Sequence, residues 1–396
     1  MVTVTDLYAS DFMHIEINAF FLRIYREYLK QEIHLFAERR HVEALARAVP
    51  IDETHCFGSF RTIFQWHASR VLLREFLTIF RVLRVVLHAR QNRSTLLHVL
   101  CASHFAHIVL RLVLKVIPVG CPVVLSIHSE LESLARPERR FWLPQFWFPK
   151  SLGIPTKNLY PLVLAKNIVC EAERRKISTA NWIAIEHPYT FPEIAEKHSA
   201  KSGCFIVGAI GAASLSRGTH QIFELAERFK EDITNGRFRF QIIGKVFPPL
   251  EQHITAAVEV PKRNGFSDKD EFDKAVNALD AVLFFCPCDS YQLTASGSIF
   301  DAVRYNKPII AYENAYFRWL RRLVRDEQFS LVRNLDDFEQ ILRKWQRNGS
   351  TPSNSAYEQL KSTHSVTEVT RDFLRQLSQK TNVQSKSALR PLKDEN

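Results

Sequence analysis

Residues 281–311 contain two short apolar runs, separated by a loop and an amphipathic segment. The first run, residues 281–285, is apolar at every position, which is typical of a parallel strand covered by helices on both faces. The second run, residues 308–311, begins with a proline that ends the preceding helix, and Asn306 tolerates the left-handed conformation just before it. This pattern predicts a strand–helix–strand unit of a parallel sheet.

A Ser-Gly-Ser sequence stands where the predicted helix begins, at Ser296, Gly297 and Ser298. The first N–H groups of a helix have no partner within it, and the positive end of the helix dipole lies at the same place. Together they favour an anion, above all a phosphate. A simpler explanation is that Ser296 only caps the helix, and the residues taken alone favour that explanation.

The chain has 396 residues, 46% hydrophobic and 24% charged, which is enough for two globular domains with their own cores. Its formal net charge of +11 predicts acidic partners, such as nucleotide phosphates or an anionic membrane surface. We expect no nucleic-acid partner, because the basic residues are spread through amphipathic segments and no recognisable nucleic-acid-binding motif occurs. The seven cysteines contain no CxxC pair, so we expect reduced thiols and no metal site.

The start of the chain lacks the pattern of a signal peptide, and its most apolar region, residues 105–125, is interrupted by charges, Pro118 and Gly120. We therefore expect no membrane-spanning helix. The predicted location is the cytoplasm, either in solution or peripherally on the inner face of the membrane.

Strand-like and helix-like segments alternate over residues 1–190, which predicts an open parallel sheet with helices, an α/β class. Strands are expected at residues 2–7, 32–37, 96–101, 123–127, 167–170 and 182–185. Residues 191–203 shift to proline, serine and charge, as in a linker. A second domain of the same class is expected over residues 204–363, with a helix at 364–380 and a polar tail at 381–396.

Four short motifs follow one another in the second half of the chain. They are Arg217-Gly218 in a loop before a helix, Gly244-Lys245 after a strand, the turn Gly265-Phe266-Ser267, and the strand sequence from Asn306 to Ala311. Over residues 204–311 this succession resembles the nucleotide-binding half of GT-B fold glycosyltransferases of the large group 1 (family 4-like) family. Residues 1–190 resemble the acceptor-binding half of such enzymes by their position and alternation.

The resemblance implies two Rossmann-like, doubly wound parallel sheets with a cleft between them, and a late helix that packs back on the first domain. It implies a hexosyltransferase that moves a sugar from a nucleotide-diphosphate donor to a glycan or lipid-linked acceptor, in cell-surface polysaccharide or glycolipid assembly. Retention of configuration is the favoured course. No cofactor and no metal are implied, since helix dipoles, N–H groups and basic side chains meet the leaving-group charge.

The resemblance also assigns site residues. Ser296, Gly297 and Ser298 would hold the diphosphate, Arg217 its charge, and Asp301 a ribose or sugar hydroxyl. Further residues assigned to the nucleotide-sugar are Ser214, Gly218, Gly244, Lys245 and, near the base, Phe266. Two positions depart from the family: Leu293 stands where an acidic residue is usual, and Ala212 where an arginine is usual.

In the first half, polar residues follow the strand expected at residues 123–127. Ligands sit beyond the carboxyl ends of parallel strands, so His128 or Glu130 is a candidate base for the acceptor hydroxyl in an inverting reaction. The alternative is that both residues form caps and turns.

Residues 69–93 form an amphipathic segment. At about 100° per residue, Arg70, Arg74, Arg81 and Arg84 fall in one narrow sector, with apolar residues such as Phe76 on the opposite side. We expect a basic stripe, either against anionic lipid headgroups or as an ordinary solvated face.

Two other functions stay open on the sequence. The departures at Ala212 and Leu293 allow a non-catalytic protein that binds nucleotide-sugars or acts as a scaffold. A sugar-nucleotide epimerase of the same fold is the third possibility.

Overall fold

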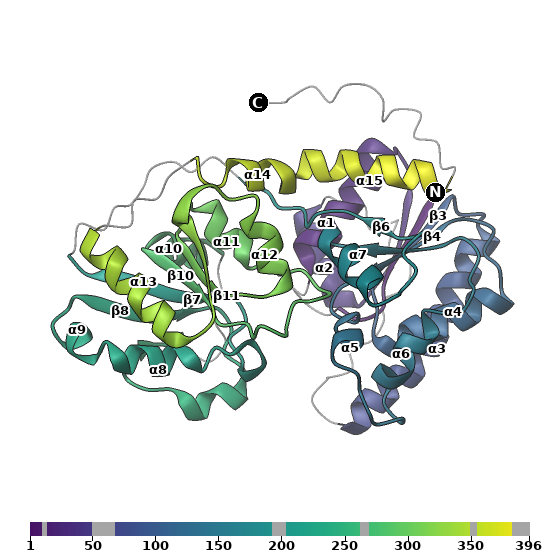
Figure 1. The fold of residues 1–396 in the computed structure, drawn as a ribbon. Coiled ribbons are helices and arrows are strands. Elements are labelled where there is room, and N and C mark those ends of the chain that lie inside the picture. The colour runs from purple at the N-terminus through teal and green to yellow at the C-terminus, as the bar shows by residue number, and fades with distance from the viewer. Residues whose placement is uncertain (10–13, 50–67, 192–202, 262–268, 349–354, 382–396) are drawn as a thin grey trace. The chain divides into compact units, whose positions relative to one another are not determined.

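The computed structural model describes residues 1–9, 14–49, 68–191, 203–261, 269–348 and 355–381 (Figure 1). The chain divides into two compact units. Unit 1 comprises Met1–Tyr189, Leu293–Ala295 and Val366–Asn396, and unit 2 comprises Thr190–Gln292 and Ser296–Ser365. Each unit has a six-stranded parallel sheet with helices, which confirms the predicted α/β class.

The sheet of unit 1 has the strand order β2-β1-β3-β4-β5-β6. Its strands are β1 (Val2–Asp6), β2 (Ile33–Phe36), β3 (Leu96–Cys101), β4 (Val123–Ile127), β5 (Leu159–Val163) and β6 (Ile183–Ala184). The chain passes from β1 to β2 in one direction and then continues from β3 in the other. The order therefore reverses between β1 and β3, where ligands bind in open α/β sheets.

Helices connect the strands of unit 1. They are α1 (Ile15–Arg23), which continues as a π-helical turn (Ile24–Tyr28), α2 (Arg39–Ala48), α3 (Ala68–Gln91), α4 (His104–Val116), α5 (Glu132–Ala135), α6 (Pro144–Ser151) and α7 (Lys166–Arg174). Helix α4 packs against both α3 and α6, and the three helices lie together in one region of unit 1 (Figure 1).

The last described helix, α15 (Val366–Thr381), belongs to unit 1. Its Phe373 ring meets the Phe21 ring edge-on, with centroids 5.3 Å apart, inside a core of fully buried residues. Its Gln376 side chain donates to the Ala184 carbonyl oxygen (2.8 Å) and accepts from the Ala184 N–H (3.0 Å). Helix α15 therefore covers apolar surface of unit 1 and satisfies the backbone of the edge strand β6.

The sheet of unit 2 has the order β12-β11-β10-β7-β8-β9, and it reverses between β7 and β10. Its strands are β7 (Phe205–Ile210), β8 (Phe238–Ile243), β9 (Val258–Glu259), β10 (Ala281–Phe284), β11 (Ile309–Tyr312) and β12 (Phe329–Val332). Its helices are α8 (Gln221–Arg228), α9 (Lys230–Thr234), α10 (Lys269–Asn277), α11 (Ile299–Arg304), α12 (Ala315–Arg321), α13 (Leu335–Asn348) and α14 (Glu358–His364).

The strand–helix–strand unit expected over residues 281–311 is confirmed. Strand β10 is buried at all four positions, as a strand covered on both faces should be. After α11 the chain turns at Asn306, which adopts the left-handed conformation with φ of 51°. The Lys307 N–H then bonds back to the Ala302 carbonyl oxygen (3.0 Å), which closes the helix end.

One expected strand of unit 1 was wrong, and one strand was missed. Residues 167–170 lie in helix α7, because the apolar pair at Ile168 and Val169 belongs to a longer amphipathic segment. The strand is instead β5, whose Pro161 disguised it in the sequence. The edge strand β6 pairs only with Leu162 and Val163 of β5. Pro161 lies outside this pairing, so the hydrogen bonds between β5 and β6 do not need its missing N–H.

Candidate functional site

The point where the sheet of unit 2 reverses is formed by the loops that follow β7 and β10. In the first loop, the Gly211 N–H donates to the Ile243 carbonyl oxygen (2.8 Å), and the Ala213 N–H donates to that of Lys245 (2.8 Å). The segments after β7 and β8 therefore run against each other. Gly244, with φ of 140°, makes this possible, because a Cβ there would stand 2.0 Å from the Gly211 carbonyl oxygen.

Gly218 has a similar packing role. It follows the short 3₁₀ turn Leu215–Arg217 and has φ of 68°. A Cβ on Gly218 would stand 2.3 Å from the carbonyl oxygen of Phe285, at the end of β10. The structure thus gives both Gly218 and Gly244 a role in bringing backbone segments together, and their contact with a nucleotide stays a prediction.

A narrow hollow of about 20 Å³ lies between these loops, roughly the space of one water molecule or one phosphate oxygen. Arg217, Ser298, Gly211 and Ala212 are among the described residues that line it. The Arg217 guanidinium lies 3.8 Å from the point where a Cβ on Gly211 would stand, and the Ser298 Cβ lies 3.1 Å from the same point. Arg217 and Ser298, 81 residues apart in the chain, therefore approach the same glycine.

Arg217 is half-buried, and within the described part of the chain no carboxylate pairs with it. Its positive charge lowers the pKa of the buried Cys286 thiol, although burial dominates and raises that pKa overall. A partly desolvated guanidinium without a carboxylate favours an incoming anion, to which it can donate two parallel bonds.

The Ser-Gly-Ser sequence divides into two parts. Ser296 is buried, with 4% of its surface exposed, and its Oγ lies 3.2 Å from the Ser298 Oγ. The Tyr291 hydroxyl also bonds to Ser296, and burial raises the pKa of Tyr291 to about 12. Ser298 and Gly297 are half-buried, and Ser298 lines the hollow. Helix α11 has only six residues, so its dipole adds little beyond its first N–H groups.

The other predicted residues of unit 2 lie around this hollow or beyond it. Asp301 lies in the first turn of α11, half-buried, and is absent from the described lining of the hollow. Lys245 is exposed, with its Nζ 5.5 Å from the centre of the Phe247 ring. The Ser214 Oγ lies 3.0 Å from the Ser216 Oγ. Phe266 lies outside the described residues.

In unit 1, Glu130 follows β4 and its carboxylate oxygen Oε2 accepts the His128 N–H (2.8 Å). The residue is 6% exposed, and burial raises the pKa of its carboxyl above the ordinary value of 4.5. His128 Nε2 lies 2.9 Å from the Leu100 carbonyl oxygen, and its ring lies against His14 with centroids 4.3 Å apart. His128 thus bonds to backbone through Nε2, and Glu130 bonds to the backbone N–H of His128, while its role as a base stays a prediction.

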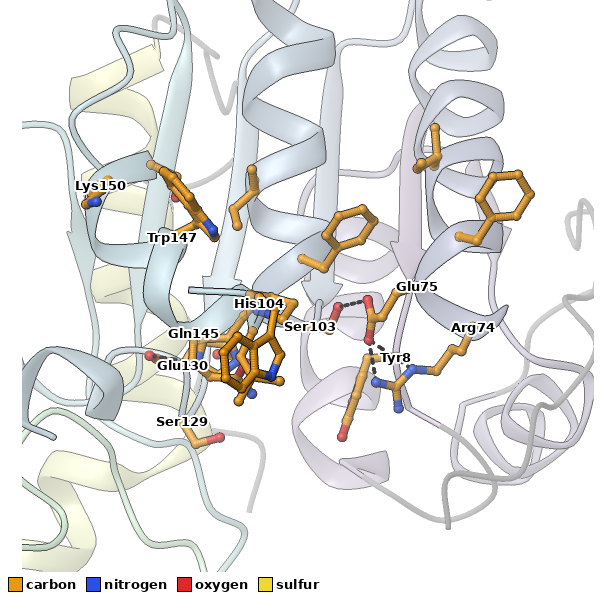
Figure 2. A pocket seen from close by; sticks show the side chains of 18 of the residues that line it. Tyr8, Arg74, Glu75, Ser103, His104, Ser129, Glu130, Gln145, Trp147 and Lys150 are labelled. Carbon is orange, nitrogen blue, oxygen red and sulfur yellow. Dashed lines mark hydrogen bonds and ion pairs between the residues drawn. The ribbon is translucent and has the colours of Figure 1, made fainter. Parts of the chain in front are cut away.

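Glu130 lines a second and larger pocket, of about 900 Å³, that lies wholly in unit 1 (Figure 2). Five of its polar side chains follow strands near the reversal point: Tyr8 after β1, Ser103 and His104 after β3, and Ser129 and Glu130 after β4. The Ser103 hydroxyl donates to the Glu75 carboxylate (2.7 Å), which is also paired with Arg74 (Figure 2).

The sequence prediction missed most of this pocket. Tyr8, Glu75 and Trp147 come from three distant segments, and no local motif connects them. One signal was available in the aromatic run FWLPQFWF at residues 141–148, in which three large side chains are exposed: Phe141 (64%), Trp142 (67%) and Trp147 (47%).

The exposed basic stripe expected on residues 69–93 is wrong. Of its described arginines only Arg84 is exposed, whereas Arg74 pairs with Glu75 and Arg81 is half-buried; the side chain of Arg70 lies outside the described residues. Several exposed residues of α3 are large and apolar, and they include Phe76 (57%), which was expected on the opposite face. The helix period tells which residues share a face, but the contacts with α4 and β1 decide which face is covered.

None of the described helices is long and apolar enough to cross a membrane. Within the same described ranges, no three side chains of histidine, cysteine, aspartate or glutamate gather as a metal site would require. Six of the seven cysteines are described, and all six are free thiols.

No family model and no curated protein sequence matches the chain. Among solved structures, it is similar to Anabaena HepE in complex with UDP and glucose, at 12% identity and a TM-score of 0.65, over 95% of this chain and 99% of that one. It is also similar to sucrose-phosphate synthase from Thermosynechococcus elongatus, at 10% identity and a TM-score of 0.69, over 96% of this chain and 98% of that one.

A third similar structure is α,α-trehalose 6-phosphate synthase from Burkholderia multivorans, at 10% identity and a TM-score of 0.62, over 96% of this chain and 98% of that one. These neighbours are GT-B glycosyltransferases with two Rossmann-like parallel-sheet domains. Their likeness extends over nearly the whole chain, and it matches the two six-stranded parallel sheets described above. The chain therefore has the GT-B fold.

Proposed function

We propose that this chain is a glycosyltransferase that moves a sugar, in the simplest case a hexose, from a nucleotide-diphosphate donor to a glycan or lipid-linked acceptor. The fold supports glycosyl transfer, and the similar HepE has been solved with UDP and with UDP-glucose. The observation that carries the proposal is the half-buried Arg217, without a carboxylate partner among the described residues, beside Ser298 and Gly211 at the reversal point of unit 2.

In the reaction, the bond between the anomeric carbon and the diphosphate breaks, a bond to the acceptor oxygen forms, and the acceptor hydroxyl gives its proton to the departing diphosphate or to a base. Arg217 would neutralise the charge that grows on the diphosphate, and N–H groups at Ser298 and the start of α11 would donate to its oxygens. These groups supply the positive charge, so we propose that the reaction is metal-independent, and EDTA should leave its rate unchanged.

The stereochemical course is open to direct measurement. The family resemblance favours retention. Inversion would need a base for the acceptor hydroxyl, and Glu130, with its raised pKa, is the carboxylate that we assign to that role. The anomeric configuration of the product, read by NMR, decides between the two courses.

A second candidate is a non-catalytic protein that binds nucleotide-sugars. Ala212 lines the hollow where related enzymes carry a cation, and Leu293 is fully buried where they carry an acid. The test is nucleotide release from a set of common donors, with Arg217→Ala as the negative control. Turnover supports the transferase, whereas UDP or GDP binding without release of nucleotide from any donor supports the second candidate.

We further propose that the protein acts in cell-surface polysaccharide or glycolipid assembly, in the cytoplasm, either in solution or peripherally at the inner face of the membrane. The acceptor-side pocket of unit 1 is the structural feature that bears on this proposal.

A further inference from the structure

The pocket of unit 1 has a polar end and an apolar end. Ser103, Ser129 and Glu130 lie at the carboxyl ends of the strands, and Trp147 and Lys150 lie on α6, further from the sheet edge (Figure 2). The remaining lining is mostly apolar and comes from α3, α4 and the segment around α6: Phe76, Ile79, Phe105, Ile108, Leu143 and Ile154. A volume of about 900 Å³ lies at the upper end of the range for small-molecule pockets.

Exposed apolar side chains are concentrated on the elements that form this pocket. Among the described residues, nine of the ten exposed large hydrophobic side chains lie on α3, α4 and the segment 141–147. Three of these side chains also line the pocket: Phe76, Trp142 and Trp147. The wall of the pocket therefore continues into an apolar surface. Clustered exposed aromatic residues of this kind mark contact with an apolar partner, and tryptophan in particular prefers the boundary between water and lipid.

Charged side chains lie at the polar end and also on α6, beside the apolar wall. At the polar end, the buried Glu130 carboxyl has a raised pKa. The Glu75 carboxylate is paired with Arg74 and accepts a hydrogen bond from Ser103. On α6, the Lys150 ammonium lies 4.3 Å from the centre of the Phe146 ring and 4.6 Å from that of Trp147. No described carboxylate pairs with Lys150.

We propose that this pocket binds the apolar part of an amphiphilic acceptor, whose hydroxyl-bearing end lies toward Ser129 and Glu130. The polar part of such a ligand matches the polar end of the cavity, and its apolar part matches the apolar wall. A free sugar or a wholly apolar molecule would match only one of the two. The role as acceptor rests on the proposed function, whereas the binding of an amphiphile does not.

The test is the binding of alkyl glucosides to the full chain, measured by calorimetry below their critical micelle concentrations. Methyl, butyl, hexyl and octyl β-D-glucoside share one head group and differ only in chain length. Affinity should rise by up to about fourfold for each methylene that enters the pocket. Equal affinity for the methyl and octyl compounds would overturn the proposal.

Two substitutions on α4 make a matched pair. Ile108 lines the pocket, and Leu112, one helical turn further on, is 48% exposed and is absent from the described lining. Ile108→Glu should abolish the dependence on chain length, and Leu112→Glu should leave it intact. Loss in both variants would mean adsorption to the apolar surface and would count against the pocket. If Ile108→Glu does not fold, Ile108→Trp, which fills the cavity, gives the same readout.

UDP binding separates this proposal from the proposed function. UDP should raise the melting temperature of both variants as it does that of the wild type, because Arg217 and Ser298 belong to unit 2. The protein could bind glucosides in a chain-length-dependent way and use a donor with another acceptor, yet transfer no sugar to octyl glucoside. That result would overturn only the acceptor role. A protein that binds octyl glucoside but no nucleotide would overturn the proposed function and keep the pocket.

Discussion

The carbonyl oxygen of Gly211 occupies the place where a side chain of residue 244 would begin, since a Cβ on Gly244 would stand 2.0 Å from it. The contact joins the loop after β7 to the loop after β8 and shapes the hollow that Arg217 lines. A glycine at position 244 is therefore a condition for the geometry of the candidate nucleotide site.

Gly244→Ala should destabilise the protein by at least about 2 kcal/mol, because it adds a backbone clash to a positive φ. Gly236 is the matched control: its φ is also positive, at 69°, but a Cβ there would meet nothing within 4 Å. Gly236→Ala should cost only about 1 kcal/mol. Urea unfolding of both variants measures the difference, and equal costs would contradict the clash.

Arg217→Ala should weaken UDP binding by about 1.5–3 kcal/mol, as the loss of a charge-assisted contact does. Arg217→Lys should recover part of that loss, since it keeps the charge but not the planar fork. Calorimetric titration with UDP measures both. Arg333→Ala, at a side chain that is 83% exposed, is the control and should bind UDP as the wild type does. Unchanged affinity in Arg217→Ala would remove this residue from the site.

Glu130 should make the protein less stable as pH rises. Burial raises its pKa in the folded state above 4.5, so the folded chain holds this proton more tightly than the unfolded chain. Stability is therefore highest below the unfolded pKa and is lost as pH rises through the folded pKa. Glu130→Gln should remove this loss, and urea unfolding from pH 4 to pH 8 checks it. Parallel curves for the two proteins would show that the pKa is not raised.

The same variant tests catalysis. If Glu130 is the base of an inverting reaction, Glu130→Gln should lower kcat by about 10²–10⁴-fold and remove the rise of rate with pH. A retaining enzyme would show a much smaller effect on kcat, and the anomeric configuration of its product would agree.

His98 predicts a loss of stability in acid. It is fully buried, with Nδ1 2.6 Å from the Tyr25 hydroxyl and Nε2 2.8 Å from the Ser126 hydroxyl, and burial lowers its pKa to about 3. The unfolded chain takes up this proton near pH 6.5 and the folded chain resists it. Stability is therefore lost as pH falls from about 6.5 toward 3. The pH dependence of unfolding should be shallower in His98→Gln, and an unchanged slope would assign it to other groups.

The sequence predicted the buried parallel strands well, because a strand covered on both faces must be apolar throughout. Strand β10 and the left-handed turn at Asn306 follow from local chemistry alone. Strand β5 was missed because it contains Pro161, and proline is excluded from a strand only where a neighbouring strand needs its N–H. The sequence does not show that the pairing of β5 with β6 leaves Pro161 out.

The candidate sites were harder to predict. The meeting of Arg217 and Ser298 at Gly211 was reached only through a family resemblance, because residues so far apart in the chain share no local pattern. Of the unit 1 pocket, the sequence predicted Glu130 as a site residue but not the cavity itself. Its wall depends on how α3, α4 and α6 pack, and periodicity cannot show which of their apolar residues stay uncovered.

Helix α15 has a consequence for the order in which the molecule is made. Phe373 completes a core that also contains Phe21, yet the ribosome synthesises all of unit 2 between these residues. A nascent chain that has not yet reached α15 carries the apolar surface around Phe21 without its cover. Unit 1 therefore cannot complete this core until unit 2 has been synthesised, so its early strands must avoid aggregation over that interval.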